Sequence, residues 1–147
     1  MAVEDVNASD YKFEIGKGVL LSEGKDVSIV ATGIMVEAAH KAKDMFKEEG
    51  IEAEVINIRT LRPIDSELFV KTAKKTKAVV TAEEHSIIGG LGSAVAEVLS
   101  EECPVPVLRV GIKDVFGESG KPSQLLEKYG LTQKDIVEKA KKAISLK

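Results

Sequence analysis

The chain has 147 residues, a hydrophobic fraction of 44% and a net charge of −3, which are ordinary values for one globular domain. Lysines and glutamates are interspersed, so the sequence has no basic stripe that would favour nucleic acid or an anionic membrane surface as a partner. It has no apolar run of membrane-spanning length, no signal-peptide pattern at its start and only one cysteine, Cys103, and these features together predict a cytoplasmic protein.

The first segment has few apolar residues and no period, so we expect a tail or linker over residues 1–12 and one domain over 13–147. Residues 16–21 lead through a turn at 23–26 to a β-branched run at 27–31. This pattern predicts a hairpin whose first arm is an edge strand and whose second arm is buried. The sheet would then be mixed, with its antiparallel strand at an edge.

A helical period follows from Ile34 to Glu49. The expected buried stripe consists of Ile34, Ala38, Ala42, Met45 and Phe46. His40 falls on the polar side and is expected to be solvated, while Gly50 stands where a left-handed helix cap belongs.

Residues 52–58 predict the next strand, and Asp65 is expected to cap a second helix. Ile64 and Phe69 are placed to form the hydrophobic staple of that helix. Two strand-helix crossovers in succession require parallel neighbouring strands, which predicts a doubly wound sheet with helices on both faces.

The second half of the chain continues this alternation, with a strand at 78–82, a helix at 93–99 and a last strand at 107–111. Cys103 is expected to pack at the end of the helix. Beyond a loop-rich stretch with a short helix through Leu125 and Leu126, the final helix is expected to begin at Thr132, with Leu131 and Ile136 as its staple.

Polar residues follow the strand at 78–82, where ligands and partner surfaces usually lie in an open α/β sheet. Glu83, Glu84 and His85 form the one cluster with acid–base potential. The alternative is that a carboxylate caps a nearby loop or pairs across a subunit contact, and that His85 contacts a partner. We favour this alternative because the sequence assigns no nucleophile, metal-ligand set or second catalytic carboxylate.

Three glycines at the next helix, Gly89, Gly90 and Gly92, invite comparison with a dinucleotide-binding fingerprint. The third glycine of that fingerprint would fall at Val95, so we favour glycines that let the helix start pack closely against a neighbouring domain. The free N–H groups near Gly92 and Ser93 form a possible site for a small anion.

Several separated motifs occur in order at family-like spacing, namely 23–33, 58–65, 83–94 and 107–112. They resemble the C-terminal domain of thiamine-diphosphate enzymes of the transketolase group, over about residues 16–143. The chain's ending, 114–120 and 125–132, resembles transketolase itself. The fold implied is a three-layer, Rossmann-like sandwich, with a mixed five-stranded sheet, mostly parallel with one antiparallel edge strand, between helices on both faces.

In this group, thiamine diphosphate lies between an N-terminal and a middle domain, held through Mg²⁺ by a Gly-Asp-Gly signature that this chain lacks. The resemblance therefore implies a non-catalytic domain that binds no cofactor or metal alone. It would pack on the upstream thiamine-diphosphate-binding domains or subunit and support a homodimer. The whole enzyme would transfer a two-carbon ketol unit between sugar phosphates in the pentose phosphate pathway.

The family resemblance also implies positions for the contacts with the rest of the enzyme. These are Glu84, His85, Gly89, Gly90, Gly92, Asp114 and Phe116. Two alternatives stay open: a stand-alone small-anion-binding or regulatory module, or the same domain of deoxyxylulose-phosphate synthase or a 2-oxoacid dehydrogenase β-subunit.

Overall fold

The computed structural model describes residues 18–33, 35–58, 65–86, 90–112 and 133–147. Its strands are β1 (Gly18–Ser22), β2 (Val27–Ala31), β3 (Ala53–Ile58), β4 (Val79–Ser86) and β5 (Val107–Ile112). Its helices are α1 (Met35–Lys47), α2 (Ser66–Thr76), α3 (Leu91–Glu102) and α5 (Gln133–Leu146). None of these helices is long and apolar enough to cross a membrane.

The strands form one five-stranded sheet in the order β1-β3-β2-β4-β5. Strands β3, β2, β4 and β5 run parallel, and β1 runs antiparallel at the edge, which confirms the predicted mixed sheet. The predicted hairpin is wrong, because β1 pairs with β3 and not with β2.

The position of β2 explains why no hairpin forms. All five residues of β2 are buried, and the strand lies between β3 and β4, so neither of its edges is free for β1. The connection from β1 to β2 passes the start of β3 at Gly24, where a Cβ would lie 2.4 Å from the carbonyl carbon of Ala53. Glycine is therefore required where the chain crosses β3.

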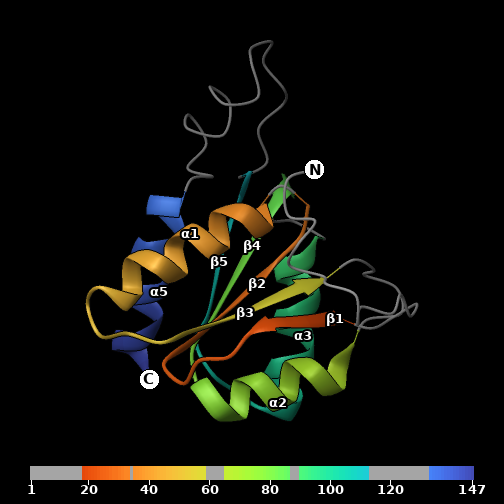
Figure 1. Ribbon diagram of the computed structural model, residues 1–147. Coiled ribbons are helices and arrows are strands. Elements are labelled where there is room, and N and C mark those ends of the chain that lie inside the picture. Colours follow the sequence, from red (N-terminus) through yellow and green to blue (C-terminus); the bar gives the residue numbers. More distant parts are fainter. Residues whose placement is uncertain (1–17, 34, 59–64, 87–89, 113–132) are drawn as a thin grey trace.

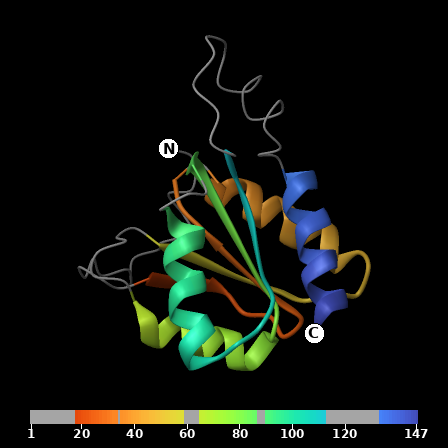
Figure 2. The ribbon, with the colours of Figure 1, turned by 180° about the vertical axis from the view of Figure 1, so that it is seen from behind.

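Helices cover both faces of the sheet, as predicted for a doubly wound fold (Figure 1). Helices α1 and α5 pack on one face over a core that includes Phe46, Val55 and Ile136. Helices α2 and α3 pack on the other face over a core that includes Phe69 and Leu91. The reverse view in Figure 2 shows α3 and α5 on opposite sides of the strands. The structure is thus the expected three-layer α/β arrangement.

The predicted helix ends are largely confirmed. Asp65 caps α2, since its side chain accepts a hydrogen bond from the Leu68 N–H at 3.2 Å, and its second oxygen accepts one from the Gly18 N–H at 2.9 Å. Gly50 has the left-handed φ of +76° that was expected after α1. Lys77, with φ 61°, ends α2 in the same conformation, which the sequence analysis did not anticipate.

Helix α1 is rotated slightly from the predicted stripe. Ala42 and Phe46 are buried, but Ala38 and Met45 are only partly buried, and the other buried residues are Met35, Val36 and Ala39. His40 is half-buried rather than solvated, and its Nε2 atom is shielded without a hydrogen-bond partner among the described residues. Burial and the nearby Lys43 lower the pKa of His40, partly opposed by Asp44.

Some predictions lie outside the described residues, including the tail over 1–12, Ile34, Ile64 and the short helix through Leu125 and Leu126. Thr132 and Leu131 also lie outside, but α5 begins at Gln133 and buries Ile136. Strand β4 continues to Ser86, beyond its predicted end at Ala82, so that Glu83, Glu84 and His85 belong to the strand.

Candidate functional site

The carboxyl ends of β2 and β4 lie at the point where the sheet changes its winding direction. The crossover through α1 leads from β2 to β3 on one side, whereas the crossover through α2 returns past β2 to β4 on the other. In open α/β sheets, ligands bind outside the carboxyl ends of strands at such a point. The structure therefore places Glu83, Glu84 and His85, at the end of β4, in the position that the sequence analysis singled out.

Glu83 is the best-defined member of this group. Its side chain is 1% exposed, and its two oxygens accept hydrogen bonds from the backbone N–H groups of Leu91 and Gly92 at 2.9 and 2.8 Å. A carboxylate in this position satisfies two donors at the start of α3 and interacts favourably with the helix dipole. Glu83 thus caps a local segment, as the non-catalytic alternative proposed, and its oxygens are not open to a substrate.

This cap also bears on the possible anion site at Gly92 and Ser93. The Gly92 N–H group donates to Glu83, so an external anion would have to displace a buried carboxylate to reach it. Ser93 also makes an interaction of its own, so it is not a free group waiting for an anion. The anion site stays a prediction, but the chain itself already supplies a negative charge at this helix start.

Gly92 is needed for packing inside the chain. A Cβ built on Gly92 would lie 2.5 Å from Arg109 Cδ and 2.8 Å from Thr81 Oγ1. Thr81 and Arg109 are register partners on β4 and β5, so Gly92 lets α3 approach these two strands. The sequence analysis expected the close approach to be to a neighbouring domain, whereas at Gly92 the structure provides an internal neighbour.

The remaining predicted contact positions are only partly described. Gly90 is the N-cap of α3 and has extended backbone, with φ −96°. Glu84 and His85 are placed through the backbone of β4 alone. Gly89, Asp114 and Phe116 lie outside the described residues, so the contact role of the set stays a prediction. Within the described ranges no group of His, Cys, Asp and Glu side chains could hold a metal ion.

Cys103 ends α3, as predicted. Its backbone N–H group donates to the Leu99 carbonyl at 3.0 Å, and its half-buried side chain packs against the core under α2 and α3. This environment is that of a small apolar residue.

A buried polar cluster at the opposite, amino end of the parallel strands was missed by the sequence analysis. Glu54, 3% exposed on β3, accepts hydrogen bonds from Thr72 Oγ1 at 2.5 Å, Lys75 Nζ at 2.8 Å and the Gly24 N–H at 3.2 Å. Ser28 Oγ lies 2.5 Å from the Thr72 hydroxyl. The signals were a glutamate inside an apolar strand and a serine inside β2.

Further polar links close the same end of the molecule. Lys147 Nζ donates to the carbonyl oxygens of Asp26 at 2.8 Å and Thr76 at 2.9 Å, and so joins the chain's last residue to the start of β2 and the end of α2. The hydrogen bond from Lys75 to Glu54 raises the pKa of Lys75. These contacts hold elements together and leave no free catalytic group among them.

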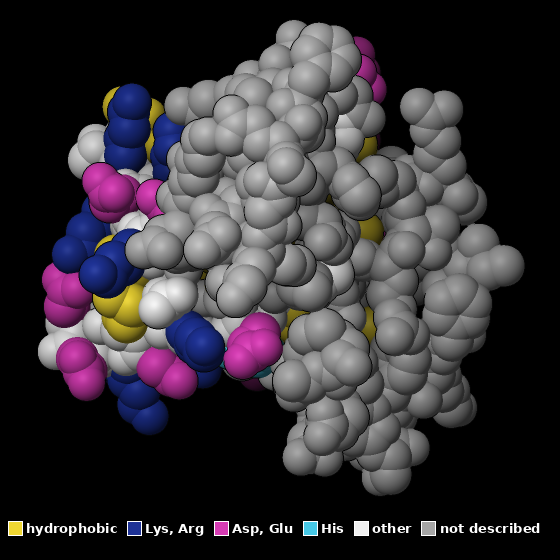
Figure 3. Space-filling view, turned by 90° about the horizontal axis from the view of Figure 1, so that it is seen from above, with side chains coloured by type: hydrophobic (Ala, Val, Ile, Leu, Met, Phe, Trp, Pro, Cys, Tyr) yellow, Lys and Arg dark blue, Asp and Glu magenta, His cyan; other side chains and the backbone are white. Residues whose placement is uncertain are grey.

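On the face seen from above in Figure 3, the charged side chains of the described residues show no accumulation of one sign. Figure 3 looks onto the molecule from above, the side toward which β4 and β5 point in Figure 1. On the part formed by α1 and α5, acidic and basic side chains alternate. This face gives no reason to expect a polyanionic partner.

Comparisons with known proteins agree with this geometry. The family model described as the transketolase C-terminal domain matches residues 16–136. A 6-deoxy-6-sulfo-D-fructose transketolase subunit of Clostridium sp. (strain MSTE9) is 53% identical over 135 residues, which are 92% of this chain and 42% of the relative. A putative transketolase C-terminal section of Methanocaldococcus jannaschii is 49% identical over 135 residues, 90% of this chain and 42% of the relative.

Among solved structures, one described as a split gene transketolase, inactive beta4 tetramer, has a TM-score of 0.92 and 59% identity. The match covers 97% of this chain and 47% of that one. Transketolase from Pichia stipitis, at 22% identity, a TM-score of 0.64 and coverage of 88% of this chain and 18% of that one, shares the fold. This chain therefore spans less than half the length of these transketolase relatives.

Proposed function

Because the chain belongs to the transketolase C-terminal domain family, we propose that it supports the thiamine-diphosphate-binding parts of a transketolase and does not catalyse on its own. The complete enzyme would transfer a two-carbon ketol unit between sugar phosphates. Thiamine diphosphate and Mg²⁺ would be bound by other domains or by another subunit, and the assembly would be a cytoplasmic homodimer or a multiple of one.

One observation carries this proposal. The chain is matched over 92% of its own length by a transketolase subunit of which it covers 42%, so more than half of that relative has no counterpart here. The carboxylate of Glu83, at the carboxyl end of β4, is committed to the start of α3. This second fact agrees with a supporting domain rather than a complete catalytic unit.

The names of the relatives suggest how the complete enzyme is assembled. One is called a subunit, another a C-terminal section and a third the inactive tetramer of a split transketolase. By analogy, we propose that this chain is inactive alone and gains activity with a separate or fused polypeptide that binds the cofactor. Glu84, His85 and Gly90 would face that polypeptide, together with Gly89, Asp114 and Phe116, whereas Gly92 packs inside the chain.

The proposal is tested by reconstitution. The chain is assayed for ketol transfer between a ketose phosphate and an aldose phosphate, with thiamine diphosphate and Mg²⁺, alone and after mixing with the upstream transketolase polypeptide of the same source. We expect activity only in the mixture, and no calorimetric signal for thiamine diphosphate with the chain alone. Turnover by the purified chain alone would refute the proposal.

The predicted contact surface has its own test within that assay. His85→Ala should weaken assembly with the upstream polypeptide, measured by analytical ultracentrifugation. Glu97→Ala, an exposed change on α3, should leave assembly unchanged. Equal assembly by both variants would remove His85 from the contact surface. An immunoblot of the source cells would then show whether the native polypeptide is fused or split.

One comparison supports a second enzyme of the same group as an alternative function. A 1-deoxy-D-xylulose-5-phosphate synthase of Heliobacterium modesticaldum is 45% identical over 128 residues, which are 86% of this chain but 20% of that enzyme. Formation of 1-deoxy-D-xylulose 5-phosphate by the reconstituted mixture, without ketol transfer, would favour that activity.

A further inference from the structure

The end of β4 is the least regular part of the parallel sheet. The register of β4 with β2 ends at Ala82. Beyond that residue, β4 makes four residue steps to Ser86, whereas the matching stretch of β5, from Val110 to Ile112, has two steps. Extra residues in a strand interrupt the ladder and re-aim side chains, and they are frequent next to functional sites. Residues 83–85 therefore need some other contact to hold them in place.

The Glu83 carboxylate supplies such a contact. Its two oxygens accept hydrogen bonds from the Leu91 and Gly92 N–H groups, which belong to residues eight and nine positions later. The end of β4 is thus tied directly to the first turn of α3, and the two lie next to each other in Figure 2. Hydrogen bonds to a carboxylate are roughly twice as strong as those between neutral groups. Because Glu83 is buried, water does not compete for them.

The start of α3 is itself fixed on the sheet. Leu91 is fully buried in the core under α2 and α3. Gly92 lets the helix approach β4 and β5 so closely that a Cβ would collide with Thr81 and Arg109. A strand end that is bound to this turn is therefore bound to the close-packed core of the domain.

The predicted contact residues lie on both sides of this link. Glu84 and His85 follow Glu83 in β4, and Gly90 immediately precedes Leu91. Glu83 itself is buried and cannot touch a partner, so any effect of Glu83 on assembly must act through its neighbours. A binding surface is precise when its residues are held by supporting groups that are locked by packing and hydrogen bonds.

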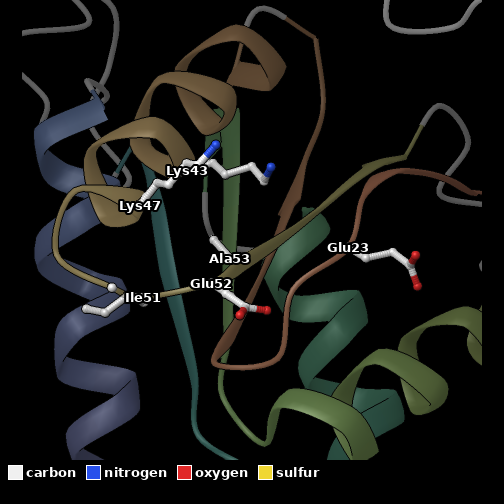
Figure 4. A pocket seen from close by; sticks show the side chains of 7 residues that line it. Glu23, Lys43, Lys47, Ile51, Glu52 and Ala53 are labelled. Atoms are coloured by element: carbon white, nitrogen blue, oxygen red, sulfur yellow. The ribbon is translucent and has the colours of Figure 1, made fainter.

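The opposite, amino end of the strands has no comparable support for a contact surface among the described residues. An open pocket of about 390 Å³ lies there between α1 and the start of β3. In Figure 4 the carboxylates of Glu23 and Glu52 point away from Lys43 and Lys47. Both carboxylates form ion pairs with lysines that do not line the pocket. This end therefore offers a suitable place for control substitutions.

We propose that Glu83 is a positioning residue of the surface that docks on the upstream transketolase polypeptide. Its carboxylate fixes the irregular end of β4 to α3 and so holds Glu84 and His85 in the arrangement that the partner binds. The inference rests on the proposed function, because it takes that polypeptide as the partner. Holding the surface in place before assembly reduces the ordering cost that binding would otherwise carry.

The experiment compares Glu83→Gln with Glu54→Gln. Glutamine keeps the size of the side chain but replaces one acceptor oxygen by an NH₂ donor, so a buried N–H group loses its acceptor. Glu54 is the matched control because it is also buried and also accepts a backbone N–H, but lies at the amino end. Urea denaturation measures the stability of each variant, and assembly is then measured where both variants are folded.

Assembly is measured by titrating the chain into a fixed amount of the upstream polypeptide and following ketol transfer. Glu83→Gln should need about tenfold more chain for half-maximal activity, whereas Glu54→Gln should stay within about twofold of the wild type. The activity at saturation should be equal for all three chains, because Glu83 touches no substrate. In the isolated chain, amide hydrogen exchange of Glu84 and His85 should be about tenfold faster in Glu83→Gln than in the wild type.

The outcomes separate docking from stability and from catalysis. Equal half-maximal concentrations for Glu83→Gln and the wild type, or unchanged amide exchange, would overturn the proposal. The same shift in Glu54→Gln would indicate a general effect of stability and would also overturn it. A lower activity of Glu83→Gln at saturation would assign Glu83 to the reaction rather than to docking. A wild-type chain that does not activate the upstream polypeptide would refute the proposed function, and this inference with it.

Discussion

The two ends of the parallel strands are held together in different ways. At the amino end, Glu54 and Lys147 connect residues that lie far apart in the sequence, such as Lys147 and Asp26, which are 121 positions apart. At the carboxyl end, Asp65 and Glu83 each accept hydrogen bonds from the first turn of a helix, within three and nine positions respectively. Asp65 also accepts a hydrogen bond from the Gly18 N–H, 47 positions away, and so joins β1 to α2. The long-range links of the amino end thus have one counterpart at the carboxyl end, whereas Glu83 serves only the start of α3.

The carboxylates at the carboxyl end also affect which helix starts an anion could reach. Helix N-termini are ready-made anion sites only while their N–H groups are free. Here the starts of α2 and α3 have carboxylates from the chain itself. At these two helix starts an anionic partner would therefore have to displace a carboxylate of the chain.

The largest expected effect on stability comes from removing the carboxylate of Glu83 at the carboxyl end of β4. Glu83→Ala would leave the buried N–H groups of Leu91 and Gly92 without acceptors and should lower the free energy of unfolding by about 3 kcal/mol. Urea denaturation measures this loss in the free energy of unfolding. Glu97→Ala, on the exposed side of α3, is the control and should cost less than about 0.5 kcal/mol. Equal midpoints for the two variants would mean that the cap is not a stabilising contact.

The matching change at the amino end is Glu54→Ala, with an expected loss of about 2 kcal/mol. The loss is smaller because Lys75 is partly exposed and can turn to water, whereas Thr72 and Gly24 lose a buried acceptor. The exposed Glu52, paired with Lys25 at 3.9 Å, gives the control Glu52→Ala, which should have little effect. The double variant of Glu83 and Glu54 should be additive within about 0.5 kcal/mol, because the two sites share no contact. Strong coupling would show that the two ends are not independent.

Gly92→Ala tests the packing next to the Glu83 cap. The new Cβ would collide with Arg109 and Thr81, which costs about 1–3 kcal/mol, and the gain in helix propensity recovers up to about 1 kcal/mol. A net destabilisation of about 1 kcal/mol is expected in urea. Combining it with Arg109→Ala should reduce the penalty, because the Cγ and Cδ atoms are then removed. An undiminished penalty in that double-mutant cycle would point to Thr81 as the obstacle.

The smallest expected effect is the pH dependence contributed by His40. Its folded-state pKa lies below the ordinary value of 6.5, so the unfolded chain binds the proton more readily. The stabilisation is complete above pH 6.5 and is lost as the pH falls toward the folded-state pKa. Relative to His40→Gln, the wild type should lose about 0.5 kcal/mol or less between pH 7 and 5, since solvent screens the group. A difference that grows as the pH falls in favour of the wild type would contradict this sign.

Most of the fold could be predicted from local patterns. The β-branched runs, the helical periods, Asp65 as a cap and Gly50 at a left-handed position are all properties of short segments, and the structure confirms them. The pairing of β1 with β3, by contrast, could not be predicted from a local pattern. Adjacent runs joined by a short turn favour a hairpin, and only the burial of β2 between two parallel strands excludes it.

The position of the candidate site could be predicted from the sequence, but the hydrogen bonds within it could not. The end of β4 was identified correctly, yet the extension of the strand through His85 and the reach of Glu83 to Leu91 depend on where α3 begins. Glu83 precedes the helix by eight positions, a spacing that matches no capping motif. The pairing of Lys75 with Glu54 likewise requires α2 to lie over β3, which no local pattern specifies.

The antiparallel direction of β1 determines at which end of the sheet the described part of the chain begins. Gly18, the first residue of β1, is paired with Ile58, the last residue of β3, so the chain enters the sheet at the carboxyl end. A parallel edge strand would have brought the entry point to the amino end, beside Lys147. The entry strand and the ends of β2 and β4 therefore share one side of the domain. The first described residue of the sheet thus lies on the same side of the domain as the surface that we propose for the partner polypeptide.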